Sequence, residues 1–110
     1  SVQELHRFLN TPVQKGGSLT WDVENLFREV VAGLGKGGGQ EYPIASISCD
    51  GWGLDYLLFD KGGAVLSPTH HYRDARTEKI SKQVFAKVPW ETIFEQTGVQ
   101  YMPINTLFQL

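Results

Sequence analysis

The chain has little cysteine, almost no net charge and no long apolar run, and each shortage excludes a class of protein. Cys49 is the only cysteine among the 110 residues, so a scaffold held by internal disulfides is excluded. Because Cys49 ends an apolar run, we expect a small buried thiol in a reduced, cytoplasmic protein. The formal net charge of -2 argues against nucleic acid or a membrane surface as a partner. No apolar run approaches the roughly 20 residues that a membrane-spanning helix needs.

What the chain does contain is the composition of an ordinary globular domain. Hydrophobic residues make up 41% of the sequence and charged residues 20%, which suits at most one domain with a modest core. Ser1 lies in a β-compatible run, and Leu110 lies in a predicted helix. We therefore expect residues 1–110 to be part of a longer protein.

Hydrophobic periodicity predicts a mixed α and β fold. Strands are expected over 2–10, 44–49, 54–59 and 64–66. Helices are expected over 23–34, 78–88 and 89–97, and from Asn105 onward. A loop is expected at 12–17 and a hairpin turn at 60–63. Thr20 or Asp22 is expected to cap the first helix, and the glycines of 35–39 to end it as a flexible linker. These glycines follow a helix and lack the Gly-Lys-Ser/Thr order, so a phosphate-binding loop is excluded. Five aromatic residues are assigned to the core: Trp21, Phe27, Phe85, Trp90 and Phe94.

The most informative stretch is a polar break between two predicted strands, Asp50-Gly51-Trp52-Gly53. Glycine is used where the backbone turns sharply or lies close to a ligand, and ligand sites of α/β sheets gather at strand ends. An indole face suits the apolar side of a sugar, and a bare glycine lets backbone groups reach its hydroxyls. A bulge or turn with a core tryptophan explains the same pattern. Asp50 suits hydroxyl binding and turn stabilisation equally, whereas Asp55 is assigned a structural role.

A second polar segment, the predicted loop 67–77, concentrates charged and aromatic side chains. His70 and His71 are adjacent on an extended loop and point to opposite sides, so they are not expected to share a metal ion. Three charged residues follow: Arg73, Asp74 and Arg76. This cluster is either a salt-bridge network that holds the loop or one wall of a sugar cleft.

Three segments, in this order along the chain, resemble the N-terminal domain of the rhamnulokinases, a group of sugar kinases in the FGGY carbohydrate kinase family. They are Asp50 to Asp55, Tyr72 to Thr77 and Pro103 to Leu110, with further similarity over 4–8 and 19–23. The resemblance implies a ribonuclease-H-like (actin-like ATPase) α/β fold, a mixed sheet with flanking helices, of which residues 1–110 hold a part. It also implies ATP-dependent phosphorylation of L-rhamnulose to L-rhamnulose 1-phosphate, with Mg-ATP as the phosphoryl donor.

The same resemblance carries a ketose contact onto Gly53. The expected substrate-binding set is Gly53, Trp52, Asp50, Asp74, Arg73 and Asn105, with Asn105 and Gln109 also expected to buttress the cleft. The catalytic aspartate and the hairpin that binds ATP phosphates fall outside residues 1–110. No catalytic, cofactor-binding or metal-binding residue is therefore expected in this segment, and no ATP or magnesium is expected to stay bound to it alone. Gly51 stands where the family has threonine, which leaves the preferred sugar open.

Two other interpretations use the same residues. A non-catalytic sugar-binding or actin-like scaffold domain would keep the fold and the cleft without the phosphate hairpin. A hydrolase of the ribonuclease-H type would need a cluster of carboxylates for two metal ions, and only Asp50, Asp55 and Asp74 could form it. The exposed edges of an incomplete sheet would also favour self-association.

Overall fold

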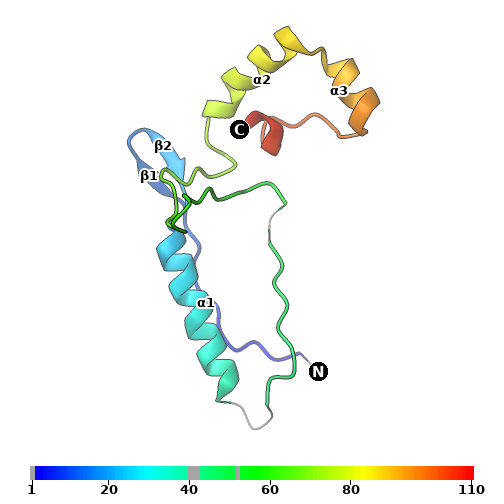
Figure 1. The fold of residues 1–110 in the computed structure, drawn as a ribbon. Helices are drawn as coiled ribbons and strands as arrows, with labels where there is room; N and C mark the ends of the chain where they lie inside the picture. Colours follow the sequence, from blue (N-terminus) through cyan, green and yellow to red (C-terminus); the bar gives the residue numbers. More distant parts are fainter. Residues whose placement is uncertain (1, 40–42, 52) are drawn as a thin grey trace.

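The computed structural model describes residues 2–39, 43–51 and 53–110 of a mixed α and β chain. The elements run in the order β1 (Val13–Lys15), β2 (Ser18–Thr20), α1 (Val23–Gly38), α2 (Arg76–Lys87), α3 (Trp90–Thr97) and the 3-10 helix η1 (Thr106–Phe108). Helix α1 extends away from the β1–β2 hairpin, and α2, α3 and η1 gather at the opposite end (Figure 1). The described chain is elongated, with extents of 58 × 34 × 29 Å.

The hairpin occupies a region that the sequence predicted only as a loop. β1 and β2 pair antiparallel, with Val13 opposite Thr20 and Lys15 opposite Ser18. The two residues of the turn, Gly16 and Gly17, have φ angles of +59° and +84°. Two-residue hairpin turns with positive φ at both positions favour glycine, because a Cβ would clash with the backbone there. The glycines thus form a tight turn in place of the predicted open loop.

Residues 69–71 lie along the free edge of this hairpin. The Trp21 amide donates to the Thr69 carbonyl at 2.9 Å, and the His71 amide donates to the Leu19 carbonyl at 2.9 Å. The Thr69 hydroxyl also donates to the Trp21 carbonyl at 2.8 Å. The predicted polar loop is therefore attached to β2, about 50 residues earlier in the chain.

Helix α1 confirms the predicted start and corrects the predicted end. The Asp22 carboxylate accepts a hydrogen bond from the Asn25 amide at 2.9 Å, as an N-terminal cap does. The helix continues through Gly38, so most of the expected glycine linker is helical. A Cβ at Gly37 would lie only 3.2 Å from Ile44 and 3.5 Å from Leu5. The glycine therefore lets the segments before and after α1 approach its backbone.

Three predicted strands are absent from the described chain. Residues 2–10, 43–49 and 54–58 have no strand assignment, and the predicted return strand 64–66 forms a single bridge, between Phe59 and Val65. The turn at 60–63 is confirmed, since the Asp60 amide donates to the Ala64 carbonyl at 2.9 Å. A strand needs a neighbour to accept its backbone hydrogen bonds. The end of 54–59 has one in 64–66, since the Leu66 amide donates to the Leu58 carbonyl at 2.8 Å, whereas 2–10 and 44–49 pair with no described strand. Cys49, expected to be buried in such a strand, is exposed.

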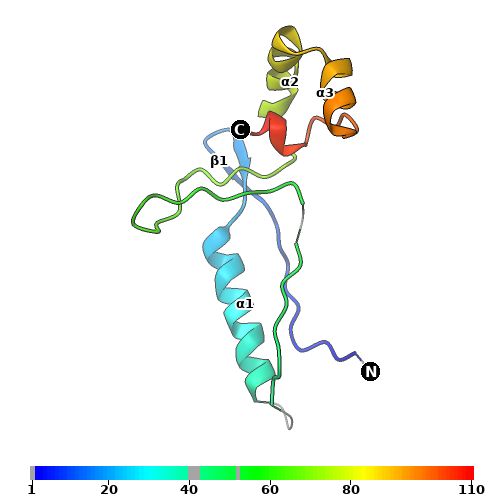
Figure 2. The same ribbon diagram turned by 45° about the vertical axis from the view of Figure 1, so that its right-hand side comes forward.

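The second half of the chain follows the prediction more closely. α2 begins two residues before its expected start, and Gly98 ends α3 with a φ of +66°. Phe85, Trp90, Tyr101 and Phe108 form an aromatic cluster with ring centroids 5.1–5.9 Å apart. The cluster joins α2, α3 and η1, which lie near one another in Figure 2. Phe108 is only 1% exposed and is the one buried apolar side chain among the residues described.

Two of the aromatic residues assigned to the core lie at the surface instead. Phe27 on α1 is 71% exposed, and Phe94 on α3 is 52% exposed. Helical spacing identifies an apolar face, but a face is buried only where another element covers it.

Asn105 does precede the last helical turn, yet its side chain donates to the Gln100 carbonyl and makes no capping bond. Within the described residues, every helix is too short or too polar to cross a membrane.

Candidate functional site

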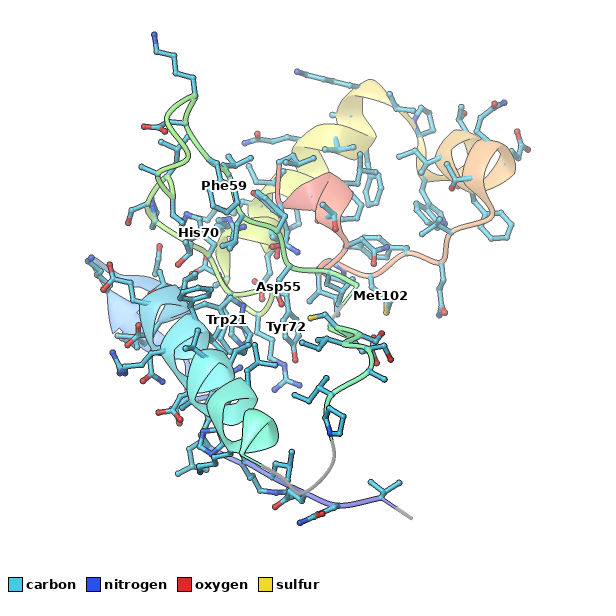
Figure 3. The ribbon with its side chains drawn as sticks, turned by 60° about the horizontal axis from the view of Figure 1, so that its bottom comes forward. Trp21, Asp55, Phe59, His70, Tyr72 and Met102 are labelled. Atoms are coloured by element: carbon cyan, nitrogen blue, oxygen red, sulfur yellow. The ribbon has the colours of Figure 1, made fainter. Side chains whose placement is uncertain are left out.

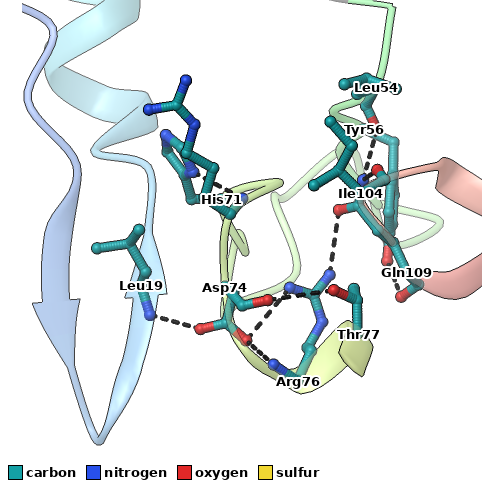
Figure 4. A network of polar contacts seen from close by, with 10 residues as sticks. Leu19, Leu54, Tyr56, His71, Asp74, Arg76, Thr77, Ile104 and Gln109 are labelled. Atoms are coloured by element: carbon teal, nitrogen blue, oxygen red, sulfur yellow. Dashed lines mark hydrogen bonds and ion pairs between the residues drawn. The ribbon is translucent and has the colours of Figure 1, made fainter. Parts of the chain in front are cut away.

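Asp74 joins the polar loop to β2. One carboxylate oxygen accepts from the Leu19 amide at 2.6 Å, and the other accepts from the Arg76 amide at 3.1 Å (Figure 4). The Arg76 guanidinium lies 3.5 Å from the second oxygen, and Asp74 is 6% exposed. Burial by itself would raise the pKa of Asp74, but the two backbone donors and the Arg76 charge outweigh it and lower the pKa below its ordinary value. Both oxygens of this carboxylate are thus engaged within the chain.

The buried imidazole of His71 lies between two aromatic rings. Its centroid is 4.1 Å from that of Trp21 and 4.5 Å from that of Tyr72 (Figure 3 labels both aromatic residues). The His71 Nδ1 atom accepts from the Arg73 amide at 3.0 Å. Burial lowers the pKa of His71, and the nearby Asp55 charge only partly opposes this. The ring is therefore neutral at pH 7 and packs as an aromatic residue.

Gln109 connects the C-terminal turn to the residues that follow Gly53. Its side-chain nitrogen donates to the Leu54 carbonyl and to the Ile104 carbonyl, both at 2.9 Å. Its side-chain oxygen accepts from the Arg76 guanidinium at 3.2 Å. Gln109 is 6% exposed, and its amide hydrogens are both used. One carboxamide therefore ties together three segments that are distant in sequence (Figure 4).

Two hydroxyl groups strengthen the same junction. The Thr106 hydroxyl donates to the Leu54 carbonyl at 3.1 Å, so this carbonyl has two donors. The Tyr56 hydroxyl donates to the Gln109 main-chain carbonyl at 2.7 Å. The stretch that begins at Leu54 is consequently held against η1 at three hydrogen bonds.

Asp55 lies within this stretch and has an unusual environment. Both of its carboxylate oxygens are buried, and neither has a hydrogen-bond partner among the residues that the structure describes. Its charge raises the pKa of His71, against the stronger effect of burial. The two oxygens of Asp55 thus lie inside the chain, and its charge acts on His71 of the polar loop (Figure 3 labels Asp55).

The residues predicted to bind substrate lie in different places: the polar loop, the exposed stretch around Gly53 and the C-terminal segment. Asp74 lies in the network of Figure 4, whereas Arg73 is exposed and places its guanidinium 5.1 Å from the Tyr72 ring centroid. Asp50 and Gly53 lie on an exposed stretch, where the Asp50 carboxylate accepts from the Gly51 amide at 2.9 Å. Trp52 lies outside the described residues, and Asn105 contacts the Gln100 carbonyl. The structure brings Asp74, Arg76 and Gln109 into one network, and the side-chain contacts just described for Asp50 and Arg73 lie outside it.

A groove lies away from this network. It has a volume of about 890 Å³ and is lined by the start of α1, the β hairpin and residues 57–69, including Phe27, Phe59 and Val65. No described member of the predicted substrate-binding set lines it. In the part of the chain that the structure describes, no three His, Cys, Asp or Glu side chains lie together as metal ligands would.

Sequence reasoning did not identify Tyr56, Thr106 or Leu54 as members of the network. Thr106 and Gln109 are both in the Pro103 to Leu110 motif, so the motif itself was the available signal. Their shared partner is a main-chain carbonyl more than 50 residues away, and a carbonyl has no signature in the sequence.

Comparison with known proteins connects the whole chain to one kind of enzyme. No family model matches the chain. Its 110 residues are 42% identical to a curated rhamnulokinase of Mannheimia succiniciproducens, of which they cover 23%. They are 37% identical to a rhamnulokinase of Enterobacter sp. (strain 638) and 38% identical to one of Pectobacterium atrosepticum, covering 22% of each. The chain therefore spans less than a quarter of the length of these curated relatives.

These relatives belong to one class of enzyme, the carbohydrate kinases. The chain is similar, over its full length, to one segment of each of them. Within that class, the relatives are rhamnulokinases. The resemblance indicated by the three sequence motifs is thus confirmed from residue 1 to residue 110.

Proposed function

We propose that this chain is a segment of a sugar kinase that transfers the γ-phosphoryl group of ATP to L-rhamnulose, giving L-rhamnulose 1-phosphate. The observation that carries the proposal is the similarity of all 110 residues to rhamnulokinases at 37–42% identity. We assign the complete protein to the ribonuclease-H-like fold of the FGGY kinases. The mixed α and β composition of the described chain agrees with that assignment only at the level of class.

Within the kinase, we assign this segment to the sugar-binding side. Gly53 is exposed, and a Cβ placed on it would meet no atom within 4 Å. Its backbone groups are thus open to a ligand. The next residue, Leu54, is held by Gln109 and Thr106. A fixed backbone beside an open glycine suits the binding of sugar hydroxyls, because an ordered partner loses less entropy on binding.

We assign no metal or nucleotide site to these residues. The described part of the chain has no group of three metal-ligating side chains. The family resemblance assigns the phosphate-binding hairpin and the catalytic aspartate to other segments, so these residues are given no step of phosphoryl transfer. We expect the isolated 110-residue chain to release no ADP with L-rhamnulose. Sugar-dependent ADP release by that isolated chain would contradict the assignment.

The proposed activity is tested by ADP release from the complete protein with a panel of ketoses and polyols. Selective turnover of L-rhamnulose supports the proposal. Turnover of a different ketose keeps the kinase and reassigns the sugar. No turnover with any member of the panel contradicts the kinase and favours a non-catalytic sugar-binding or scaffold protein.

The role of Gly53 is tested by Gly53→Val in the complete protein. Because the new side chain would meet no protein atom within 4 Å of its Cβ, we expect an unchanged melting temperature. We expect the KM for the ketose to rise at least tenfold, since the valine methyl groups would occupy the space assigned to the sugar. Gly35→Val is the matched control, since that position also faces open space but lies on α1. An unchanged ketose KM in Gly53→Val would remove this residue from the site.

A further inference from the structure

We propose that Gln109 is a positioning residue. Together with Thr106, it sets the backbone geometry at the end of the sugar-binding turn, residues 50–53, through the carbonyl of Leu54, the residue that follows. The inference rests on the proposed function and adds a specific role for the C-terminal motif. It concerns side chains that are not expected to touch the substrate.

The described residues of this turn, 50, 51 and 53, restrain its backbone weakly. Gly51 and Gly53 lack side chains, and each would have open space around a Cβ. Glycine has the widest range of backbone conformations, so a turn with two of them needs an external restraint. The Asp50 carboxylate restrains its start through the Gly51 amide, at an exposed position.

The restraint at the other end of the turn is much stronger. The Leu54 carbonyl accepts from the Gln109 side-chain nitrogen at 2.9 Å and from the Thr106 hydroxyl at 3.1 Å. Two donors on one carbonyl occupy both of its lone pairs. They therefore fix the plane of the peptide unit between Leu54 and Asp55, directly after the turn. Among the described residues, Gln109 is one of the few buried polar side chains, so water competes little for its bonds.

The orientation of the Gln109 carboxamide is also determined. Its oxygen accepts from the Arg76 guanidinium at 3.2 Å, and its nitrogen donates to Ile104 as well as to Leu54. A carboxamide turned by 180° would bring its hydrogens toward the guanidinium and its oxygen toward two carbonyls. Arg76 in turn lies beside Asp74, which is attached to β2. These contacts therefore connect the turn to η1 directly and to the β1–β2 hairpin through Arg76 and Asp74.

The test uses the complete kinase and four variants. Gln109→Met keeps the size of the side chain but removes both donors. Thr106→Val removes the second donor, and Thr106→Ser restores a hydroxyl. Tyr101→Phe is the matched control, because the Tyr101 hydroxyl donates to Ser81 at 3.3 Å in the same half of the chain without touching Leu54.

We expect the KM for the ketose to rise about tenfold in Gln109→Met and about threefold or more in Thr106→Val, the ratios that correspond to losing one net hydrogen bond. The KM for ATP should stay within twofold in both. Thr106→Ser and Tyr101→Phe should keep the ketose KM of the wild type. A merely structural role would lower the melting temperature without this separation of the two KM values.

Two results would overturn the inference. One is a ketose KM within twofold of wild type in Thr106→Val, which also serves if Gln109→Met does not fold. The other is an equal rise of the ketose and ATP KM values. Absence of ketose turnover in the wild-type kinase would instead refute the proposed function, and the positioning role with it.

Discussion

The substitution Asp74→Asn isolates the contact that joins the polar loop to β2. The two oxygens of Asp74 accept from two different backbone amides, those of Leu19 and Arg76. An asparagine has one acceptor oxygen, so one amide would face an NH₂ group and lose its partner. Losing a hydrogen bond to a charged group costs about 1.5–3 kcal/mol, and a buried donor without an acceptor costs about 1–3 kcal/mol more. Because these two costs overlap, we expect the free energy of unfolding to fall by about 2–4 kcal/mol.

The assay combines calorimetry with hydrogen exchange on the complete protein. We expect the melting temperature of the complete protein to fall by about 2–4 °C, because the shift per kcal/mol becomes smaller as a protein becomes larger. We also expect faster exchange of the Leu19 amide, which is the local effect of losing its acceptor. Hydrogen exchange is the more specific measurement because it does not require two-state unfolding.

Asp60→Asn is the matched control for this change. The Asp60 carboxylate also accepts from two backbone amides, those of Gly62 at 2.7 Å and Ala64 at 2.9 Å, but through a single oxygen at an exposed position. Asparagine keeps that oxygen, so the expected loss is below about 1 kcal/mol. If Asp74→Asn costs no more than the control, the reasoning about the Asp74 network is wrong.

Further predictions concern pH, the turn and the core. The free energy of unfolding should fall as the pH drops below 6.5, the ordinary pKa of histidine. Burial lowers the pKa of His70 and His71 in the folded chain, so the unfolded chain binds protons first. Calorimetry at a series of pH values measures this loss. A second loss should occur below pH 3.8, since the pKa of Asp74 is lowered and its stabilisation is complete only above that value; Asp74→Asn should remove this second loss. Gly51→Thr, which restores the family residue into open space, should leave the melting temperature unchanged and alter the ratio of kcat/KM values among ketoses; identical ratios would separate Gly51 from sugar selection. Phe108→Ala should lower the free energy of unfolding by about 3–5 kcal/mol in denaturant titrations, because the ring is buried in the aromatic cluster, and a loss below about 1 kcal/mol would contradict that core.

The helices and turns were largely predictable from the sequence. The Asp22 cap, the end of α3 at Gly98 and the turn at 60–63 all depend on side chains within a few residues of the effect. The strands were not predictable in the same way. Residues 44–49 have suitable side chains, but strand formation depends on a neighbouring chain segment that local sequence does not specify.

The sequence by itself determined the local elements of α1, α2 and α3 and, through three motifs, the similarity to rhamnulokinases. Only the tertiary structure decided that Asp74 accepts from the amide of Leu19 and that Gln109 donates to the carbonyl of Leu54, each across 55 residues of sequence. The physical reason is that every residue but proline carries the same backbone amide and every residue the same carbonyl. A polar side chain therefore signals that it needs a partner, and the packing of the chain selects which backbone group supplies it.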